Sequence, residues 1–291
     1  MSAKQVLVIA NPVAGRGRGS RAARELAEHL RAAGVETEVF ETGKRGDARA
    51  RSAGTGADVQ SIVAVGGDGT LSEVLSGLPR RTIPVGQLAL GTANVLALDL
   101  GLPRDPRELA RVVAQGRTRR IDVAHVGNRL CFLGASAGYD ATVVHGLERL
   151  RRGPITRITW ARAALSAFAN YTPPEITLEV DGKLVAGAFG MVILANVVHY
   201  AGWPTLAADQ VHDDGRFEAY LFPARSRLGL LRHAARGLCA RFPGGGVVRV
   251  SGRRFRVAAA KPVPLQVDGD AAGQLPFELV VEPEPCRILV P

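Results

Sequence analysis

The chain has 291 residues, of which 46% are hydrophobic and 22% charged, so it can bury a sizeable core and is not a disordered protein. Its net charge is +10, and all but four of its 37 basic residues are arginine, which favours anionic partners. Three widely spaced cysteines exclude a disulfide framework and a CxxC metal site, and no apolar run is long enough for a signal peptide or a bilayer span. We therefore expect a cytoplasmic protein that would meet a membrane only peripherally.

The first 120 residues alternate apolar runs with helical patterns. Ser20 is the expected N-cap of the first helix, and Gly34 follows its end. This alternation is typical of a parallel sheet with helices on both faces, in which ligands bind where strands end and helices begin. The predicted strands are 6–10, 35–40, 61–65 and 84–90, and the predicted helices are 20–33, 71–78 and 106–115.

After about residue 122 the pattern changes to short β-rich segments separated by Gly, Pro and Asp. Asp181-Gly182 lies between two such segments and predicts a two-residue hairpin turn. We predict an α/β domain over 1–122 and a mostly β domain over 123–291, and we leave open whether the last residues return to the first domain. Further strands are expected at 217–222, 247–250, 255–259, 264–267 and 277–282, with helices near 155–171 and 226–242.

Three glycine-containing loops follow strands of the first domain. The clearest is GGDGT at 66–70, which ends an apolar strand and leads into a helix expected at Leu71. Its glycines let the backbone approach a bulky anion, and the helix directs free N–H groups at that anion. Asp68 can face a metal ion that bridges phosphates, and Thr70 adds a hydroxyl. The alternative is a structural turn in which Asp68 caps the helix.

The other two loops are Asn11-Pro12 with its following glycines, after the first strand, and GTAN at 91–94, after the fourth. Because all three loops leave the same edge of the proposed sheet, we expect them to line one phosphate-binding cleft.

Together these motifs resemble those of lipid kinases with a diacylglycerol kinase catalytic domain, a family that includes sphingosine kinases and bacterial soluble diacylglycerol and phosphatidylglycerol kinase-like enzymes. The resemblance covers nearly the whole chain in the family's order. It implies an NAD kinase/diacylglycerol kinase-like α/β domain that holds ATP, followed by a β-sandwich domain for a lipid substrate. The residues that carry it are Asn11-Pro12, GGDGT at 66–70, GTAN at 91–94, Ile121-Asp122-Val123, the segment 132–138, Asp213-Asp214-Gly215 and Val267-Asp268-Gly269-Asp270.

The resemblance also assigns roles. Asp268, with Asp270 beside it, would be the catalytic pair, and Asp268 the general base that takes the proton from the lipid hydroxyl. From spacing alone, Asp268-Gly269 would be a hairpin turn; its place near the C-terminus favours the catalytic role. Mg²⁺ would be bound by Asp68, Asp122 and Asp214, although a surface turn is an equal alternative for Asp214. The nucleotide would be bound by Asn11, Gly66, Gly67, Asp68, Gly69, Thr70, Gly91, Thr92 and Asn94.

Two positions depart from the family's pattern. Val95 follows Asn94 where many members carry an aspartate, and Asp270 stands where glutamate is usual. These departures leave the lipid open, either diacylglycerol-like or sphingosine-like, and leave a catalytically weak nucleotide- or lipid-binding homologue as an alternative.

Three other classes compete with the lipid kinase. NAD kinases share GGDGT, but their Asn-Glu or Asn-Asp pair is missing; a dinucleotide oxidoreductase would need a third glycine where Ser20 stands. A nucleic-acid partner is not expected, because aromatic residues are 5% of the chain and show no RNA-binding motif. We expect an ATP- and Mg²⁺-dependent lipid kinase, with a homodimer left open. Arginines and apolar residues in 147–171 and 225–242 suggest contact with a membrane, although such stripes more often pack on their own domain.

Overall fold

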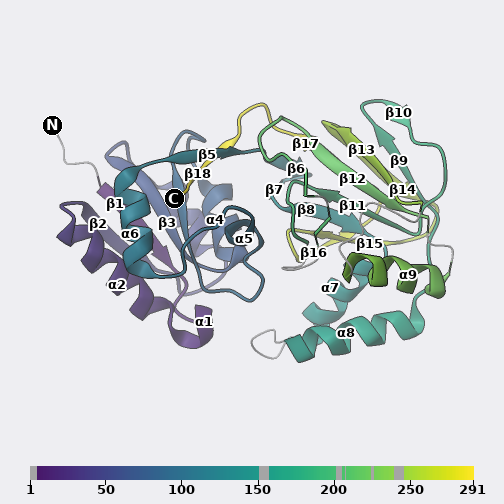
Figure 1. The fold of residues 1–291 in the computed structure, drawn as a ribbon, viewed down its shortest axis with the longest axis horizontal. Coiled ribbons are helices and arrows are strands. Elements are labelled where there is room, and N and C mark those ends of the chain that lie inside the picture. Colours follow the sequence, from purple (N-terminus) through teal and green to yellow (C-terminus); the bar gives the residue numbers. More distant parts are fainter. Residues whose placement is uncertain (1–4, 151–156, 201–204, 207, 224–225, 239–245) are drawn as a thin grey trace. The chain divides into compact units, whose positions relative to one another are not determined.

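The computed structural model describes residues 5–150, 157–200, 205–206, 208–223, 226–238 and 246–291 (Figure 1). It divides into two compact units. Unit 1 comprises Met1–Ile121 and Glu284–Pro291, and unit 2 comprises Asp122–Pro283. The chain therefore leaves unit 1 once, forms all of unit 2, and then returns to unit 1.

Unit 1 contains a six-stranded sheet in the order β2-β1-β3-β4-β18-β5. The neighbouring strands are parallel except for β18 and β5, which are antiparallel. The inner strands are continuous apolar runs, as expected for a sheet covered on both faces. The strands are β1 (Gln5–Ala10), β2 (Glu36–Glu41), β3 (Val59–Gly66), β4 (Val85–Ala89), β5 (Thr118–Ile121) and β18 (Cys286–Leu289).

Helices cover this sheet. In α2, Ala23, Leu26 and Leu30 follow helical spacing and pack with α6 over β1, β3 and β4. Asp105 caps α6 by accepting from the backbone N–H groups of two residues in its first turn. The helices of unit 1 are α1 (Ala14–Gly17), α2 (Gly19–Ala32), α3 (Asp47–Ala53), α4 (Asp68–Gly77), α5 (Val95–Asp99) and α6 (Pro106–Gln115).

Two predicted helix starts are wrong. The N-cap of α2 is Arg18, so Ser20 lies inside the first turn. Similarly, α4 begins at Asp68 rather than Leu71, with Gly67 as its extended N-cap. In both cases the glycines take part in the first turn instead of preceding it, so counting them as helix breakers placed the start too late.

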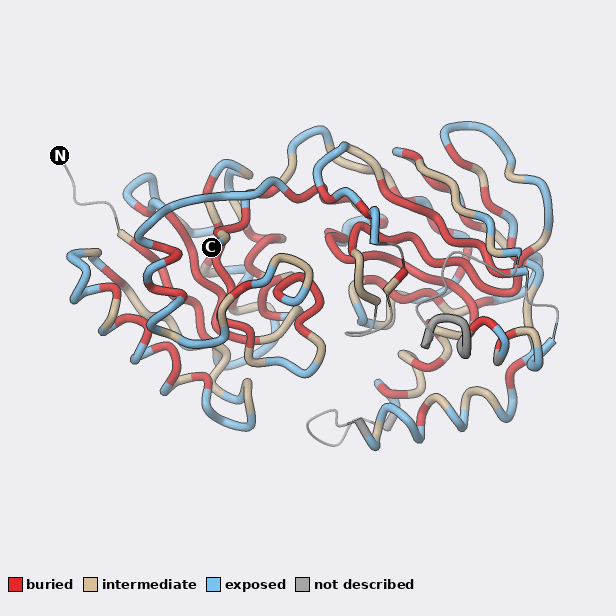
Figure 2. The backbone as a smooth tube through the Cα atoms, viewed as in Figure 1, coloured by how far each residue is buried: buried red, intermediate tan, exposed pale blue. Residues whose placement is uncertain are grey.

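Unit 2 is a sandwich of two antiparallel six-stranded sheets, in the orders β10-β9-β14-β17-β6-β7 and β13-β12-β11-β8-β15-β16. One apolar core fills the space between them and includes Phe217, Phe255 and Leu279; Figure 2 shows the buried strands of the sandwich. The α/β plus β-sandwich architecture is confirmed. The strands are β6 (Ala124–Val126), β7 (Arg129–Cys131), β8 (Gly134–Ala137), β9 (Ile176–Val180), β10 (Lys183–Leu184), β11 (Met191–Ala195), β12 (Phe217–Phe222), β13 (Val248–Gly252), β14 (Arg254–Ala259), β15 (Pro264–Val267), β16 (Asp270–Gln274) and β17 (Phe277–Val281).

In the described part of unit 2, three helices lie outside the sandwich: α7 (Tyr139–Leu150), α8 (Arg157–Asn170) and α9 (Arg227–Leu238). The first of these was not expected from the sequence. No helix among the described residues is long and apolar enough to cross a membrane.

In α9, Leu230 and His233 are buried and the His233 ring contacts Phe222 edge-on, whereas Leu228 is exposed. Parts of the two expected membrane segments, residues 151–156, 225 and 239–242, lie outside the described residues.

Candidate active site

The GGDGT loop joins β3 to α4 with little free space on one side and open space on the other. A Cβ on Gly66 would lie 2.3 Å from Oγ1 of Thr70, so glycine allows the Thr70 side chain to fold back over the end of the strand. Thr70 is consequently buried. Gly69, in the first turn of α4, is exposed, and a Cβ there would meet no atom within 4 Å. The open approach to this helix N-terminus is therefore at Gly69 rather than Thr70.

The GTAN loop closes on itself and packs against the GGDGT loop. Oδ1 of Asn94 accepts the N–H of Gly91 at 2.9 Å, and its Nδ2 donates to the Gly91 carbonyl at 2.8 Å. Asn94 also has a left-handed backbone (φ 50°), which asparagine tolerates well. A Cβ on Gly91 would lie 2.6 Å from Cα of Gly67, so the backbones of the two loops touch. In this structure the Asn94 amide shapes the loop, and Thr92 lies exposed on it.

Asp68 lies between these loops. Its Oδ2 accepts the N–H of Val95 at 3.2 Å, while its Oδ1 is buried without a hydrogen-bond partner. Burial raises the pKa of Asp68 above its usual value, although hydrogen bonds from the Val95 and Asn94 backbone oppose the rise. A buried carboxylate oxygen without a donor is costly, and a proton or a cation at Oδ1 of Asp68 would offset that cost.

The Asn11 loop lies at the same edge of the sheet. The Asn11 N–H donates to the Val65 carbonyl at 2.9 Å, which ties the loop to the end of β3. Gly19 is obligatory beneath it, because a Cβ there would lie 1.9 Å from the Asn11 carbonyl oxygen. Gly15 approaches Leu90 at the start of the third loop. The three loops thus gather at the ends of neighbouring parallel strands β1, β3 and β4.

In unit 2, Asp268 is both a turn residue and a bound carboxylate. Asp268 and Gly269 have positive φ angles of 50° and 83° and connect β15 to β16. The carboxylate accepts three backbone N–H groups from a segment more than 130 residues away: Leu133 (2.9 Å) and Gly134 (3.0 Å) bind Oδ1, and Phe132 (3.1 Å) binds Oδ2.

The pKa of Asp268 follows from two opposing effects. Burial of the carboxylate raises it, the backbone hydrogen bonds oppose the rise, and the balance raises the pKa to about 6. Asp268 is therefore ionised at neutral pH but more basic than an ordinary aspartate. Asp270, its expected partner, is exposed at the start of β16.

A buried network supports this turn. Gln266 accepts the Gly269 N–H through Oε1 at 2.8 Å, and its Nε2 donates to the hydroxyls of Ser136 (3.0 Å) and Tyr200 (3.1 Å). Both hydroxyls in turn donate to Oδ2 of Asp140 at 2.5 Å. Burial raises the pKa of Asp140. Asp140 was not expected from the sequence, where its one signal is its position two residues after the segment 132–138.

Asp122 and Asp214, the two other aspartates expected to bind Mg²⁺, lie close enough for the charge of Asp214 to influence Asp122. Oδ2 of the buried Asp122 accepts the Gly215 N–H at 2.6 Å. Burial, and then the negative charges of Asp214 and Asp213, raise the pKa of Asp122. Asp214 is exposed and caps its own turn through the Arg216 N–H at 3.0 Å. Within the described part of the chain, no cluster of three or more His, Cys, Asp or Glu side chains could hold a metal ion.

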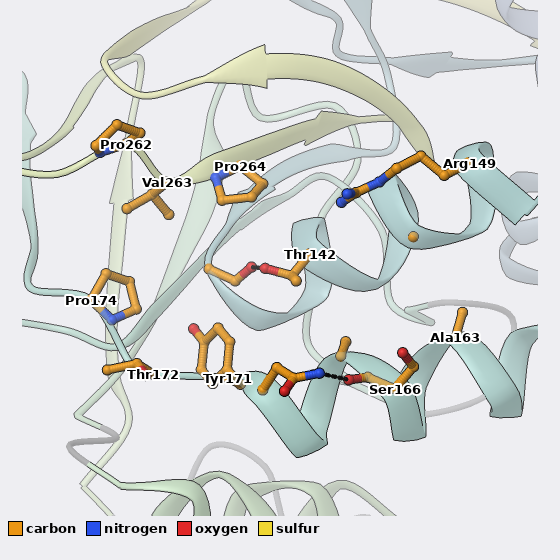
Figure 3. Close-up of a pocket in the computed structure, with 14 residues that line it drawn as sticks. Thr142, Arg149, Ala163, Ser166, Tyr171, Thr172, Pro174, Pro262, Val263 and Pro264 are labelled. Carbon is orange, nitrogen blue, oxygen red and sulfur yellow. Dashed lines mark hydrogen bonds between the residues drawn. The ribbon is translucent and has the colours of Figure 1, made fainter.

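Unit 2 also contains a cavity of about 650 Å³, bordered by α7, α8 and the segment before β15 (Figure 3). Its polar side chains are largely satisfied within the wall: Thr142 donates to the Gly138 carbonyl at 2.9 Å, and Tyr171 to the Gly190 carbonyl at 2.7 Å. Arg149 is the charged side chain that lines it. The described wall is therefore mainly apolar, with the Arg149 cation and the polar side chains of Ser166, Asn170 and Thr172.

A parallel α/β unit with glycine-rich loops gathered at one sheet edge, joined to an antiparallel sandwich, defines a two-domain protein of the NAD kinase/diacylglycerol kinase type. The diacylglycerol kinase catalytic domain matches residues 5–126, and the YegS C-terminal NAD kinase beta sandwich-like domain matches residues 134–290. The chain belongs to the diacylglycerol kinase catalytic-domain family of lipid kinases.

Individual proteins similar to this chain are named diacylglycerol kinases. The chain is 27% identical over 281 residues to a diacylglycerol kinase of Staphylococcus carnosus, covering 94% of this chain and 90% of that one. It is also 27% identical over 282 residues to a diacylglycerol kinase of Bacillus subtilis, covering 95% and 93%. A crystal structure of a diacylglycerol kinase from Bacillus anthracis has the same fold, with a TM-score of 0.80, 20% identity, and coverage of 99% of this chain and 97% of that one.

Proposed function

We propose that this protein is an ATP- and Mg²⁺-dependent lipid kinase that transfers the γ-phosphoryl group to the hydroxyl of a diacylglycerol-like lipid. The main supporting observation is Asp268, a carboxylate fixed by three backbone N–H groups with its pKa raised to about 6. The names of the relatives favour diacylglycerol over a sphingosine-like acceptor.

Asp268 has the properties of a general base for this reaction. Its pKa keeps it ionised at neutral pH while making proton acceptance easier than for an ordinary aspartate. Among the described residues, the Phe132 N–H is the one donor that binds Oδ2, so this oxygen can also accept a substrate hydroxyl. In the proposed step the lipid O–H proton passes to Oδ2, the lipid oxygen bonds to the γ-phosphorus, and the bond from that phosphorus to the β–γ bridging oxygen breaks, releasing ADP.

The nucleotide would be bound in unit 1. The three gathered loops present glycine backbone and the N-terminus of α4, a ten-residue helix with its open approach at Gly69. The buried Oδ1 of Asp68 fits a cation, so Asp68 would hold Mg²⁺. Within unit 2, Asp122 and Asp214 offer a separate pair of carboxylates for a cation. When bound, Mg²⁺ would neutralise negative charge on the phosphates.

The lipid chain would occupy the cavity of unit 2. Its volume of about 650 Å³ lies in the range of ordinary ligand pockets. Its wall has few unsatisfied polar groups, which suits an acyl chain, and Arg149 could bind an oxygen of the headgroup or glycerol ester.

The test is transfer of labelled phosphate from ATP, with and without Mg²⁺, to diacylglycerol, sphingosine and ceramide in mixed micelles, with NAD as a soluble acceptor. We expect Mg²⁺-dependent label on diacylglycerol. Label on sphingosine alone would overturn the substrate assignment, label on NAD would identify an NAD kinase-like enzyme, and label on no acceptor would indicate a binding homologue.

The chain provides a matched control for the base. Asp181-Gly182 forms a second positive-φ hairpin turn, and the Asp181 carboxylate likewise accepts two backbone N–H groups, from Arg253 (3.0 Å) and Arg254 (2.9 Å). Asp268→Asn should abolish turnover while Asp181→Asn should not. Equal losses in the two variants would mean that the Asp268 carboxylate serves only the turn.

A further inference from the structure

The turn that contains Asp268 is bound at one end by the segment before β8 and at the other by Gln266. The Asp268 N–H donates to the Gly134 carbonyl at 2.8 Å, and the Gly134 N–H donates to the Asp268 carboxylate. The next residue, Gly269, donates its N–H to Oε1 of Gln266 at 2.8 Å. The orientation of the Gln266 amide therefore decides whether the second half of the turn has an acceptor.

Two hydroxyls fix that amide. Gln266 lies directly opposite Ser136 in the β8–β15 ladder, and both side chains are buried. Nε2 of Gln266 donates to the hydroxyl oxygens of Ser136 at 3.0 Å and Tyr200 at 3.1 Å. Each hydroxyl uses its single hydrogen in a bond of 2.5 Å to Oδ2 of Asp140. Oxygen-to-oxygen distances of this length are typical of a hydroxyl that donates to an ionised carboxylate.

Asp140 sets the direction of these hydrogen bonds. An ionised carboxylate only accepts, so Ser136 and Tyr200 must donate to it and have only lone pairs left for Gln266. The amide must then turn Nε2 toward the hydroxyls, which leaves Oε1 for the Gly269 N–H. With the amide reversed, Nε2 would face that N–H, and two donors without an acceptor between them are costly.

The residues on either side of this network line the cavity of unit 2. Gly138 and Thr142, two positions before and two positions after Asp140, belong to its wall, and so does Pro264, two positions before Gln266. Figure 3 shows Thr142 and Pro264 at the pocket. The network therefore connects the Asp268 turn to α7, the helix that borders the proposed lipid site.

We propose that Asp140 is a positioning residue for the general base: by orienting Gln266, it holds the Asp268 turn in the conformation from which the carboxylate accepts the lipid proton. Its effect on catalysis rests on the proposed lipid kinase function, whereas its effect on the turn does not. The competing role is purely structural, a network that stabilises the sandwich without influencing the base.

Two tyrosine variants separate these roles. Tyr200→Phe removes one of the hydroxyls that Asp140 orients. Tyr220→Phe is the matched control, because Tyr220 is a buried tyrosine of the same unit whose hydroxyl donates to a side-chain oxygen outside the network, Oε1 of Gln210, at 3.2 Å. Both variants should lower the melting temperature by similar amounts. In diacylglycerol phosphorylation only Tyr200→Phe should lower kcat, by about tenfold, with KM for ATP unchanged. Equal kcat values in the two variants would mean that the network is only structural.

Variants of Asp140 identify the property that matters. Asp140→Leu keeps the branching of the side chain but has no acceptor, so it should lower kcat roughly 10- to 100-fold. Asp140→Asn keeps a carbonyl oxygen that can accept from both hydroxyls, so it should recover most of that loss. Equal losses in the two variants would show that the acceptor does not orient the network and would overturn the proposal.

Hydrogen exchange followed by mass spectrometry observes the turn without using activity. In peptides that span β15 and β16, Asp140→Leu and Tyr200→Phe should exchange faster than the wild type and Tyr220→Phe should not, because only the first two loosen the acceptor of the Gly269 N–H. Unchanged exchange in both network variants contradicts the proposal, as does faster exchange with an unchanged kcat. If Asp140→Leu does not fold, Tyr200→Phe provides the same test.

The two readouts also separate this proposal from the proposed function. If the wild type phosphorylates no lipid, the kinase assignment fails. Hydrogen exchange then decides whether Asp140 fixes the turn.

Discussion

Replacing Asp268 by asparagine should remove activity and change the pH dependence of stability in a calculable way. In the folded protein burial raises the pKa of Asp268 to about 6 from its ordinary value of 3.8. Below about pH 4 the carboxyl is protonated in both states. Between pH 4 and 6 the folded state holds the proton more tightly, so folding stability contributed by this group falls as pH rises, and above pH 6 the loss is complete.

The size of this loss follows from the difference of about two pH units. At about 1.4 kcal/mol per unit, the wild type should lose about 3 kcal/mol of stability between about pH 3 and 7, most of it above pH 4, that an asparagine variant does not lose. The offset between the two proteins at pH 4 should be small, about 1 kcal/mol, because the asparagine amide replaces only the acceptor for the Phe132 N–H.

Urea denaturation at several pH values measures this difference. The chain's two tryptophans, Trp160 and Trp203, both fall within the sequence range of unit 2, so their fluorescence follows the unit that carries Asp268. Subtracting the variant's curve from the wild-type curve removes the titration of all other groups. A flat difference between pH 4 and 7 would refute the buried-carboxylate argument.

The same variant should lose activity. Loss of a general base lowers kcat by roughly 10²- to 10⁴-fold, and in the wild type kcat/KM should fall about tenfold per pH unit below pH 6 because only the ionised carboxylate accepts the proton. An asparagine variant within threefold of the wild-type rate would exclude Asp268 as the base even if its stability curve is as expected.

Three other changes test the remaining parts of the site. Gly91→Ala would place a methyl group 2.6 Å from Cα of Gly67, so it should lower the melting temperature and raise KM for ATP at least tenfold. Gly69→Ala adds its methyl group in open space, so it should raise KM for ATP without changing the melting temperature. An unchanged KM for ATP in Gly69→Ala would mean that the nucleotide binds elsewhere. Asp68→Asn should raise the Mg²⁺ concentration needed for activity at least tenfold while leaving thermal stability at pH 7 equal or higher, because burial raises the pKa of this carboxyl; a lower melting temperature contradicts this reasoning. Ser136→Ala removes a hydroxyl that bonds to two buried side chains and should cost about 1–3 kcal/mol in urea denaturation; no loss would mean that the network carries no stability.

The sequence predicted the architecture well because the signals were local. Buried parallel strands such as β1 and β3 are largely apolar runs. The Asp181-Gly182 turn connects two paired strands, and Asp-Gly is a sequence typical of such two-residue turns. Several elements were missed. The missed helices α1, α3, α5 and α7 are either short or begin directly after loops without a capping signal, and the missed strands β5, β6, β7, β8, β11, β16 and β18 have at most five residues each.

The parts of the site that were missed depend on residues far apart in the sequence. Whether Asp268 is a turn residue or a functional carboxylate could not be decided from Asp-Gly alone, because its partners at 132–134 are more than 130 positions away and the structure uses it in both ways. Asp140 acquires its environment from Ser136, Tyr200 and Gln266 together, and no spacing rule links those positions. The burial and the raised pKa of Asp268 and Asp140 could therefore be found only in the structure.

The position of β18 has a consequence for the order in which the chain folds during synthesis. In the sheet of unit 1, β18 lies between β4 and β5, and β5 pairs with no other strand of that sheet. All strands of unit 2 precede Cys286 in the sequence, so β4 keeps an open edge and β5 has no partner until the end of the chain has been synthesised. Unit 1, although it begins first, can finish last, and removal of the final eight residues would leave an unpaired edge strand that invites aggregation.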